Sequence, residues 1–200
     1  MGRFLWLMNT PGNPPGFVHH LAPFRFDVAQ QYDLDRADLS VYDGVMLGMH
    51  SDQRHLRTQA DRLSGYMETG GAVIFNGHVA HPFLPGLTPF RPVPQQGLES
   101  LRIHVLTDHP LTHGLTSDHL TFQRSVAGFY GRGTNPPPDG ATVLTGVGPD
   151  HAPVDWIDRR GKGWLYVHTG NDLFAHYHRA DPDGLSALHA FFGFFARVPA

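Results

Sequence analysis

The sequence predicts an α/β fold in which helices cover both faces of one mostly parallel sheet. The first observation is a strand–helix–strand succession over residues 44–48, 58–69 and 72–76. The second is a short apolar run at 3–8, and the third is an amphipathic pattern that ends the chain at 183–198. The 200 residues contain no internal repeat and no linker that would split them, so we expect one domain, 1–200.

The first strand is expected at 3–8, where "RFLWLM" stops at the loop sequence "NTPGNPPG". The prolines and glycines of this loop forbid a long helix before about residue 22. The segment "FRFDV" (24–28) has the composition of a second strand.

The clearest element is a βαβ unit. In "YDGVMLGMH" (42–50) an uninterrupted apolar run indicates a strand covered on both faces. Thr58 and Asp61 have the spacing of a capping box, and Gly70 is suited to end the helix that follows. "AVIFN" (72–76) is then the next strand, parallel to 44–48 because a helix crosses between them.

The second half of the chain is rich in strands. We expect strands in 101–106 and 142–147, and two more in "VDWID" and "WLYVHT", joined by a glycine turn in "RRGKG". The last helix places Leu185, Leu188, Phe192 and Phe195 on one face, which should pack on the sheet. Its further phenylalanines fit either a helix buried on two sides or a subunit interface, so homo-oligomerisation stays open.

Composition excludes several classes of function. The formal net charge is −3, the pI is about 6.5 and no basic stripe occurs, which argues against nucleic acid as a partner. Cysteine is absent, so disulfides, thiolate metal sites and cysteine nucleophiles are excluded, and a cytoplasmic location is favoured. Neither a secretory signal nor an apolar run of membrane-spanning length is visible, so no membrane association is expected.

Four segments in this order resemble one family: "YDGVMLGMH", a helix ending in "YMETGG", "AVIFNGHVA" and "PVDWIDRRGKGWLYVHTGND". "DHPLTHGL" and "GATVLTGV" agree in position as well. Together they are similar to the trehalose-utilisation (ThuA-like) family, which belongs to the class I glutamine amidotransferase-like superfamily. The resemblance covers nearly the whole chain and implies a flavodoxin-like three-layer sandwich.

The resemblance also implies site residues. Family members place a histidine in the turn after the strand at 72–76, which is His78, and another after 44–48, which His50 matches. True amidotransferases carry a cysteine in the first of these turns, and without one the chain cannot be a glutaminase. The last loop reads Gly170-Asn171-Asp172 where the family often has Gly-His, and His168 is the nearest substitute.

Open sheets of this kind bind ligands at the carboxyl ends of their strands. We therefore expect His78, His50 and Asp52 to be catalytic, with His78 as general acid/base near the N-terminus of a following helix. Asp52 is also suited to capping a local turn, and the same holds for His78. The expected substrate-binding residues lie in the same turns: Asn76, Gly77, His81, His168, Asn171 and Asp172.

These residues leave three functional hypotheses. The first is a hydrolase-like enzyme acting on a small polar molecule, for which the resemblance suggests a sugar derivative. The second is a non-catalytic domain of the same fold that binds a ligand or partner. The third is a metal-dependent variant of the first, with a divalent ion such as zinc held by His50, His78 and a carboxylate.

Overall fold

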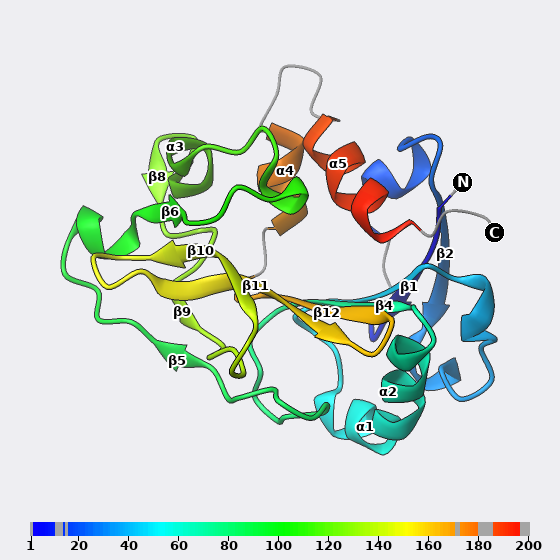
Figure 1. Ribbon diagram of the computed structural model, residues 1–200. Helices are drawn as coiled ribbons and strands as arrows, with labels where there is room; N and C mark the ends of the chain where they lie inside the picture. The colour runs from blue at the N-terminus through cyan, green and yellow to red at the C-terminus, as the bar shows by residue number, and fades with distance from the viewer. Residues whose placement is uncertain (1, 11–13, 15, 171–172, 180–185, 197–200) are drawn as a thin grey trace.

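The computed structural model describes residues 2–10, 14, 16–170, 173–179 and 186–196. Eight strands form one sheet in the order β2-β1-β3-β4-β12-β11-β10-β6. Figure 1 shows this sheet between two layers, with α1 and α2 on one face and α4 and α5 on the other. The predicted three-layer α/β architecture is confirmed.

The first half of the sheet is parallel. It contains β1 (Arg3–Met8), β2 (Arg25–Gln30), β3 (Gly44–Leu47), β4 (Ala72–Asn76) and β12 (Gly163–His168). The pairs β1–β2, β1–β3, β3–β4 and β4–β12 are all parallel, as predicted for the strands at 3–8, 44–48 and 72–76. Among the parallel strands, β1 lies between β2 and β3, which is the flavodoxin-like order with its switch point between β1 and β3.

The second half of the sheet is antiparallel. It consists of β11 (Ala152–Arg160), β10 (Thr142–Val147) and the edge strand β6 (Ile103–Val105). β11 and β12 form the predicted hairpin, in which Gly161 supplies a positive φ of 57°. Short strand pairs flank the sheet: β5 (Arg91–Pro92) with β9 (Gly133–Thr134), and β7 (Phe122–Gln123) with β8 (Val126–Ala127).

The helix predicted at 58–69 is two helices, α1 (Gln53–Thr58) and α2 (Ala60–Glu68). The capping box predicted from Thr58 and Asp61 is wrong, because the N-cap of α1 is Asp52 and the Thr58 hydroxyl donates to His55 O instead. Gly70 follows α2 with φ 112°, which confirms its expected role at the helix end.

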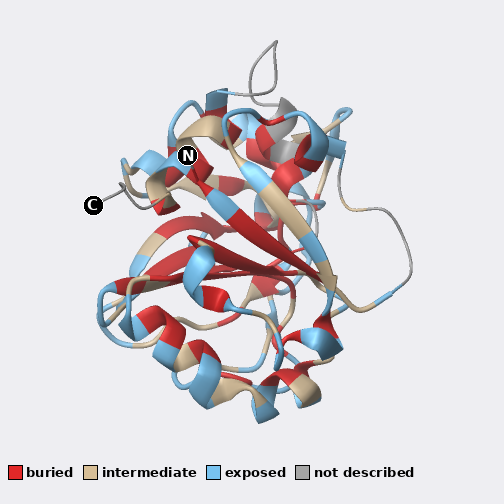
Figure 2. Cartoon of the chain, turned by 90° about the vertical axis from the view of Figure 1, so that its right-hand side faces the viewer, coloured by how far each residue is buried: buried red, intermediate tan, exposed pale blue. Residues whose placement is uncertain are grey.

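The last helices cover the other face of the sheet. They are α4 (Leu173–Arg179) and α5 (Ser186–Phe195), and α3 (Ser117–Thr121) lies near β6. Leu188, Phe192 and Phe195 of α5 are buried as predicted, whereas Leu185 lies outside the described residues. Ala187 and Phe191 are also buried, and Figure 2 shows the buried strands enclosed between the helical layers. The helix is therefore buried over a wider face than the four predicted positions.

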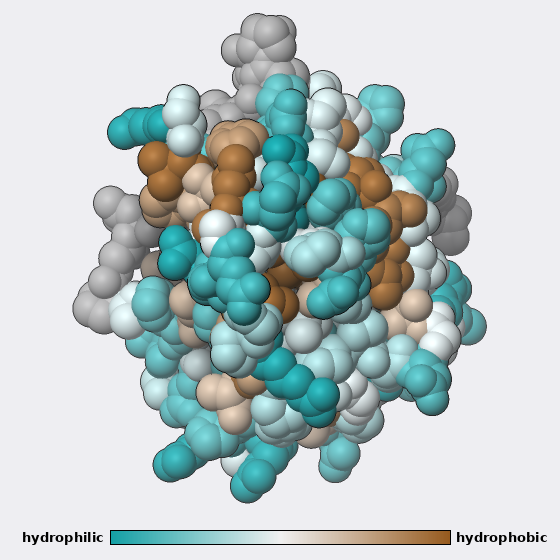
Figure 3. Space-filling model, turned by 90° about the vertical axis from the view of Figure 1, so that its left-hand side faces the viewer, coloured by the Kyte–Doolittle hydropathy of each residue, from teal (hydrophilic) through white to brown (hydrophobic). Residues whose placement is uncertain are grey.

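Five 3₁₀ turns complete the described elements: η1 (Gly16–His19), η2 (Gln31–Asp33), η3 (Leu39–Val41), η4 (Leu98–Leu101) and η5 (Pro110–Thr112). At the β6 edge, Ile103 N donates to Thr121 Oγ1 (2.9 Å) and Val105 N donates to Ser117 Oγ (3.3 Å). Two side chains of α3 thus cover backbone donors of the edge strand. On this side of the molecule apolar patches alternate with hydrophilic side chains (Figure 3).

Candidate functional site

The turn after β4 is built around Gly77. A Cβ at this position would lie 2.8 Å from Met49 Cα, so only glycine lets the loop after β3 pack against this turn. Gly77 N donates to His168 O (3.0 Å), and Asn135 Nδ2 donates to Gly77 O (2.8 Å). Gly77 is buried, and its contacts hold neighbouring loops together.

His78 is half-buried beside this turn and stacks on Phe90, with ring centroids 3.8 Å apart and an interplanar angle of 11°. No helix begins after β4, so the expected position of His78 at a helix N-terminus is wrong. Burial, and then the nearby His168, lower the pKa of His78. The ring is therefore held in its neutral form by desolvation and not by a helix dipole.

Asp52 caps a helix. Its Oδ1 accepts from Arg54 N and His55 N (both 3.0 Å), and its Oδ2 accepts from Tyr32 OH (3.0 Å). These hydrogen bonds, with that from His55 N first and that from Tyr32 next, lower the pKa of the Asp52 carboxyl. The capping alternative is the one that the structure supports, because both oxygens serve local structure and not a histidine of the site.

His81 is exposed and lies away from the pocket described below. Its Nε2 is 3.4 Å from Arg54 Nε, and its backbone N donates to Gln53 Oε1 (2.9 Å). The Gln53 side chain also donates to His78 O (2.7 Å), so it connects α1 to the turn after β4. His78 and His81 do not share a helix face, because 78–81 is irregular.

A pocket of about 370 Å³ opens at the carboxyl ends of β1, β3 and β4. It lies at the switch point between β1 and β3, where sheets of this order bind ligands. Its volume is within the usual range for small-molecule sites. The lining residues are Trp6, Leu7, Met8, Asn9, Thr10, Phe17, Gly48, Met49, His50, Ser51, Asn76, Phe174 and Ala175.

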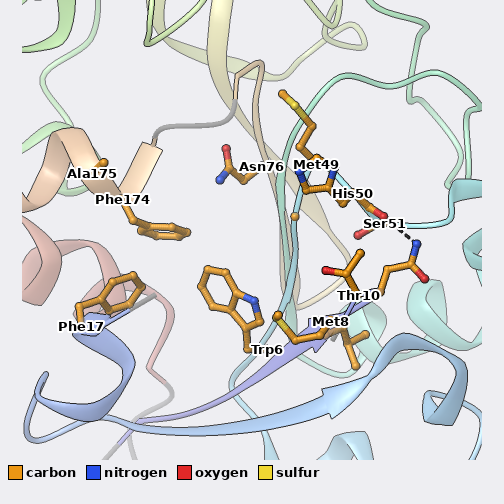
Figure 4. A pocket seen from close by; sticks show the side chains of 13 residues that line it. Trp6, Met8, Thr10, Phe17, Met49, His50, Ser51, Asn76, Phe174 and Ala175 are labelled. Carbon is orange, nitrogen blue, oxygen red and sulfur yellow. Dashed lines mark hydrogen bonds between the residues drawn. The ribbon is translucent and has the colours of Figure 1, made fainter. Parts of the chain in front are cut away.

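One wall of the pocket is aromatic. Trp6 of β1, Phe17 of η1 and Phe174 of α4 contact one another, with ring centroids 5.2–6.0 Å apart. The opposite side is polar: Figure 4 shows Asn76, His50, Ser51 and Thr10 across the cavity from these rings. Asn9 Nδ2 donates to His50 O (2.8 Å), which joins the loops after β1 and β3. The pocket thus combines an apolar face with several hydrogen-bonding groups.

Of the predicted site residues, His50 and Asn76 line this pocket. His78, His81, Asp52 and Gly77 are not among its described lining residues, although Gly77 directly follows Asn76. Asn171 and Asp172 lie outside the described residues. The aromatic wall was missed by the sequence reasoning, although Trp6 lies within one predicted strand and the phenylalanine count of 14 is high.

His168 lies in a polar cluster that is buried. Its Nδ1 is 2.7 Å from Asp155 Oδ1, and the side chains are 0% and 2% exposed. Asp155 also accepts hydrogen bonds from Tyr130 OH (2.7 Å), Tyr166 OH (2.8 Å) and the Thr145 hydroxyl. Sequence reasoning missed Asp155, whose signal is a carboxylate in the middle of the apolar strand "PVDWI".

The charge state of this cluster follows from its contacts. Burial alone would raise the pKa of Asp155, but His168 and the hydroxyl donors hold it below its usual value. Burial, and then the Asp155 carboxylate, raise the pKa of Tyr130 and Tyr166 well above the usual value, so both hydroxyls remain donors. Asp155 is therefore a buried, ionised carboxylate.

The described residues contain no group of three or more His, Asp or Glu side chains that could hold a metal ion. A zinc site of His50, His78 and a carboxylate accordingly does not form among them. In the same part of the chain, no helix has the length and apolarity needed to cross a membrane.

No protein-family profile matches the chain, and no curated protein matches it in sequence. Solved structures do match. Cytoplasmic protein STM3548 from Salmonella typhimurium aligns with TM-score 0.64 and 12% identity over 99% of this chain and 100% of its own. Cytoplasmic protein STM1381 from Salmonella typhimurium LT2 aligns with TM-score 0.60 and 10% identity over 98% of this chain and 100% of its own.

Two glycosidases align as well. The exo-β-1,4-mannosidase Op5Man5 from Opitutaceae bacterium strain TAV5 gives TM-score 0.53 and 16% identity over 94% of this chain. The β-galactosidase from Rahnella sp. R3 aligns with TM-score 0.53 and 15% identity over 94% of this chain. The matched parts are 35% and 31% of these enzymes, so this chain corresponds to about a third of either one. At these identities the likeness shows the fold alone: an α/β domain with a mixed, mostly parallel sheet.

Proposed function

We propose that the chain binds a small polar molecule with one apolar face, of the size of a sugar or polyol derivative, in the pocket between β1, β3 and β4. The observation that carries this proposal is the aromatic wall of Trp6, Phe17 and Phe174 opposite a polar rim. A sugar ring has the matching construction, because its C–H face packs on aromatic rings while its hydroxyls bind polar side chains. The glycosidases among the similar structures, and the resemblance to the ThuA-like family, support a carbohydrate-derived ligand.

Within this pocket His50 and Asn76 supply the main polar side chains opposite the rings. Asn76 offers both a donor and an acceptor, and His50 offers the same in its neutral form. Ser51 and Thr10 add hydroxyl groups at the rim. Such a set suits a neutral ligand with many hydroxyls better than an anion, which would favour arginine or lysine.

The binding test is calorimetric titration with methyl glycosides of glucose, galactose and mannose, with sodium acetate as a charged control. His50→Ala should weaken binding about 2- to 10-fold, the range of one lost hydrogen bond. His119→Ala, an exposed histidine on α3 outside the pocket, should leave affinity unchanged. Equal affinities for the two variants, or binding of acetate alone, would reject the proposed ligand class.

A second candidate is a hydrolase-like reaction in the same pocket. It is favoured by the ionised Asp155 beside His168, because a carboxylate that orients a histidine is a common arrangement for general base catalysis. The expected roles of His78 and Asp52 do not support it, since His78 stacks on Phe90 and Asp52 caps α1. Hydrolysis of 4-nitrophenyl glycosides by the purified protein would test this candidate.

A further inference from the structure

The two nitrogens of the His168 ring have different surroundings. The ionised Asp155 carboxylate has no proton to give, so Nδ1 must carry the hydrogen in the 2.7 Å contact. An imidazole with its hydrogen on Nδ1 can accept a proton at Nε2. Three hydroxyl groups on the carboxylate fix its position and hence the orientation of the ring.

The surroundings of Nε2 differ from those of Nδ1. Among the described residues no donor reaches Nε2, although the atom is fully buried. A buried polar atom without a partner is uncommon in folded proteins, because its burial is not compensated by a hydrogen bond. Gly170 lies directly against this nitrogen, since a Cβ there would come within 2.5 Å of Nε2.

The sheet register places His168 next to the pocket. His168 of β12 pairs with Asn76 of β4, and Asp155 of β11 pairs with His168 from the other side. Neighbouring strands are about 4.8 Å apart, so only one strand spacing separates His168 from a residue that lines the pocket. The Asp155 contact uses Nδ1 on the β11 side, and Nε2 is the ring nitrogen that this contact leaves unused.

We propose that His168, held by Asp155, is a proton-accepting residue beside the inner end of the pocket, next to Asn76 in the sheet. The proposal rests on the proposed function and deepens it. In the step itself, the proton of a ligand or water O–H moves to Nε2, and the O–H electron pair stays on that oxygen. The accepted proton then lies on the ring beside the Asp155 carboxylate, which stabilises the positive charge.

The first test uses the unaltered protein labelled with ¹⁵N-histidine, with His168 assigned through its backbone. Nitrogen–proton correlation spectra should show hydrogen on Nδ1 and a bare Nε2. Asp155→Asn should replace this single tautomer by a mixture, which a merely structural carboxylate would not do. Hydrogen on Nε2 in the unaltered protein, or an unchanged tautomer in the variant, would overturn the proposal.

The second test asks whether Nε2 faces the pocket. Diethyl pyrocarbonate acylates unprotonated imidazole nitrogens, and peptide mapping reports each histidine. His168 should react slowly in the unaltered protein and severalfold faster in Asn76→Ala, while His109, remote in the sequence and partly buried, should react equally in both. Circular dichroism confirms that the variant is folded. Equal protection of His168 in both proteins would overturn the proposal.

The third test separates this inference from the proposed function. Methyl β-D-galactoside should shift the His168 Nε2 resonance if the sugar reaches the inner end of the pocket. Binding of the sugar with no change at Nε2 would overturn the role of His168 and leave the binding function intact. If no glycoside binds, the proposed function fails, and the tautomer and acylation results still decide whether His168 is a proton acceptor beside the pocket.

Discussion

Polar side chains at the carboxyl ends of neighbouring strands have opposite surroundings in two parts of the sheet. At the carboxyl ends of β1, β3 and β4, Thr10, His50 and Asn76 surround an open cavity. One strand further, His168 and Asp155 are almost fully buried and are bonded to hydroxyl groups of the protein. The proposed ligand site therefore lies in the open first half, whereas the second half buries the Asp155 carboxylate.

The largest expected effect comes from the buried half. Asp155→Ala removes the partner of three hydroxyls and of His168, and breaking a buried pair in this way costs about 3–5 kcal/mol. Urea unfolding should show this loss directly. Asp158→Ala, on the same strand with a partly exposed bridge to Arg160, should cost about 1 kcal/mol or less. Similar losses for the two variants would contradict the distinction between the two regions.

The next effect concerns the contact between the loops that frame the pocket. Gly77→Ala places a Cβ 2.8 Å from the Met49 backbone and should cost about 1–3 kcal/mol through overpacking. The matched control is Gly65→Ala in α2, where a Cβ has no neighbour within 4 Å. This control should gain about 0.5–1 kcal/mol, the helix preference for alanine. Thermal unfolding of both variants measures the difference, and a neutral Gly77→Ala would contradict the close approach.

The cap of α1 should contribute less than the buried cluster. Asp52→Ala is expected to cost about 1 kcal/mol, the usual value of an N-cap, and Thr58→Ala should cost less because Thr58 caps no helix. Denaturant unfolding of the two variants makes the comparison. A larger loss for Thr58→Ala would restore the capping box expected from the sequence.

The smallest expected effect is a pH dependence due to His78. Its folded-state pKa lies below the reference value of 6.5, so below that pH the unfolded chain binds the proton first and stability falls. His78→Gln should reduce the slope of stability against pH just below 6.5 and leave the slope above it unchanged. Unfolding at a series of pH values tests this, and identical slopes in the two proteins would refute the burial of His78.

Local patterns predicted the fold better than the site. The apolar runs 3–8 and 72–76 correspond residue by residue to β1 and β4, because a strand covered on both faces has an unmistakable composition. The helix start was missed because two acceptable caps, Asp52 and Thr58, lie close together in the sequence. The hydrogen bonds of Asp52 with Tyr32 and Gln31, which hold it in the cap position, come from a distant segment.

The site depends on contacts that sequence spacing does not encode. The aromatic wall joins Trp6, Phe17 and Phe174, which come from three distant segments. The neutral state of His78 depends on burial beside Phe90, within a long irregular segment, and the charge of Asp155 depends on Tyr130. His50 and Asn76 line the pocket because one follows and the other ends a parallel strand, where the general rule for such sheets applies, and their functional roles stay predictions.

The central claim is that the ligand enters the pocket between β1, β3 and β4. Amide chemical shifts recorded during titration with methyl β-D-galactoside test it most directly. The account predicts saturable shifts at 48–51 and 76–77, on the loops beside the aromatic wall, with none at His104 and His151 near β6 and β10. Shifts centred on His104 and His151, or no saturable shifts with any of the three methyl glycosides, would contradict it.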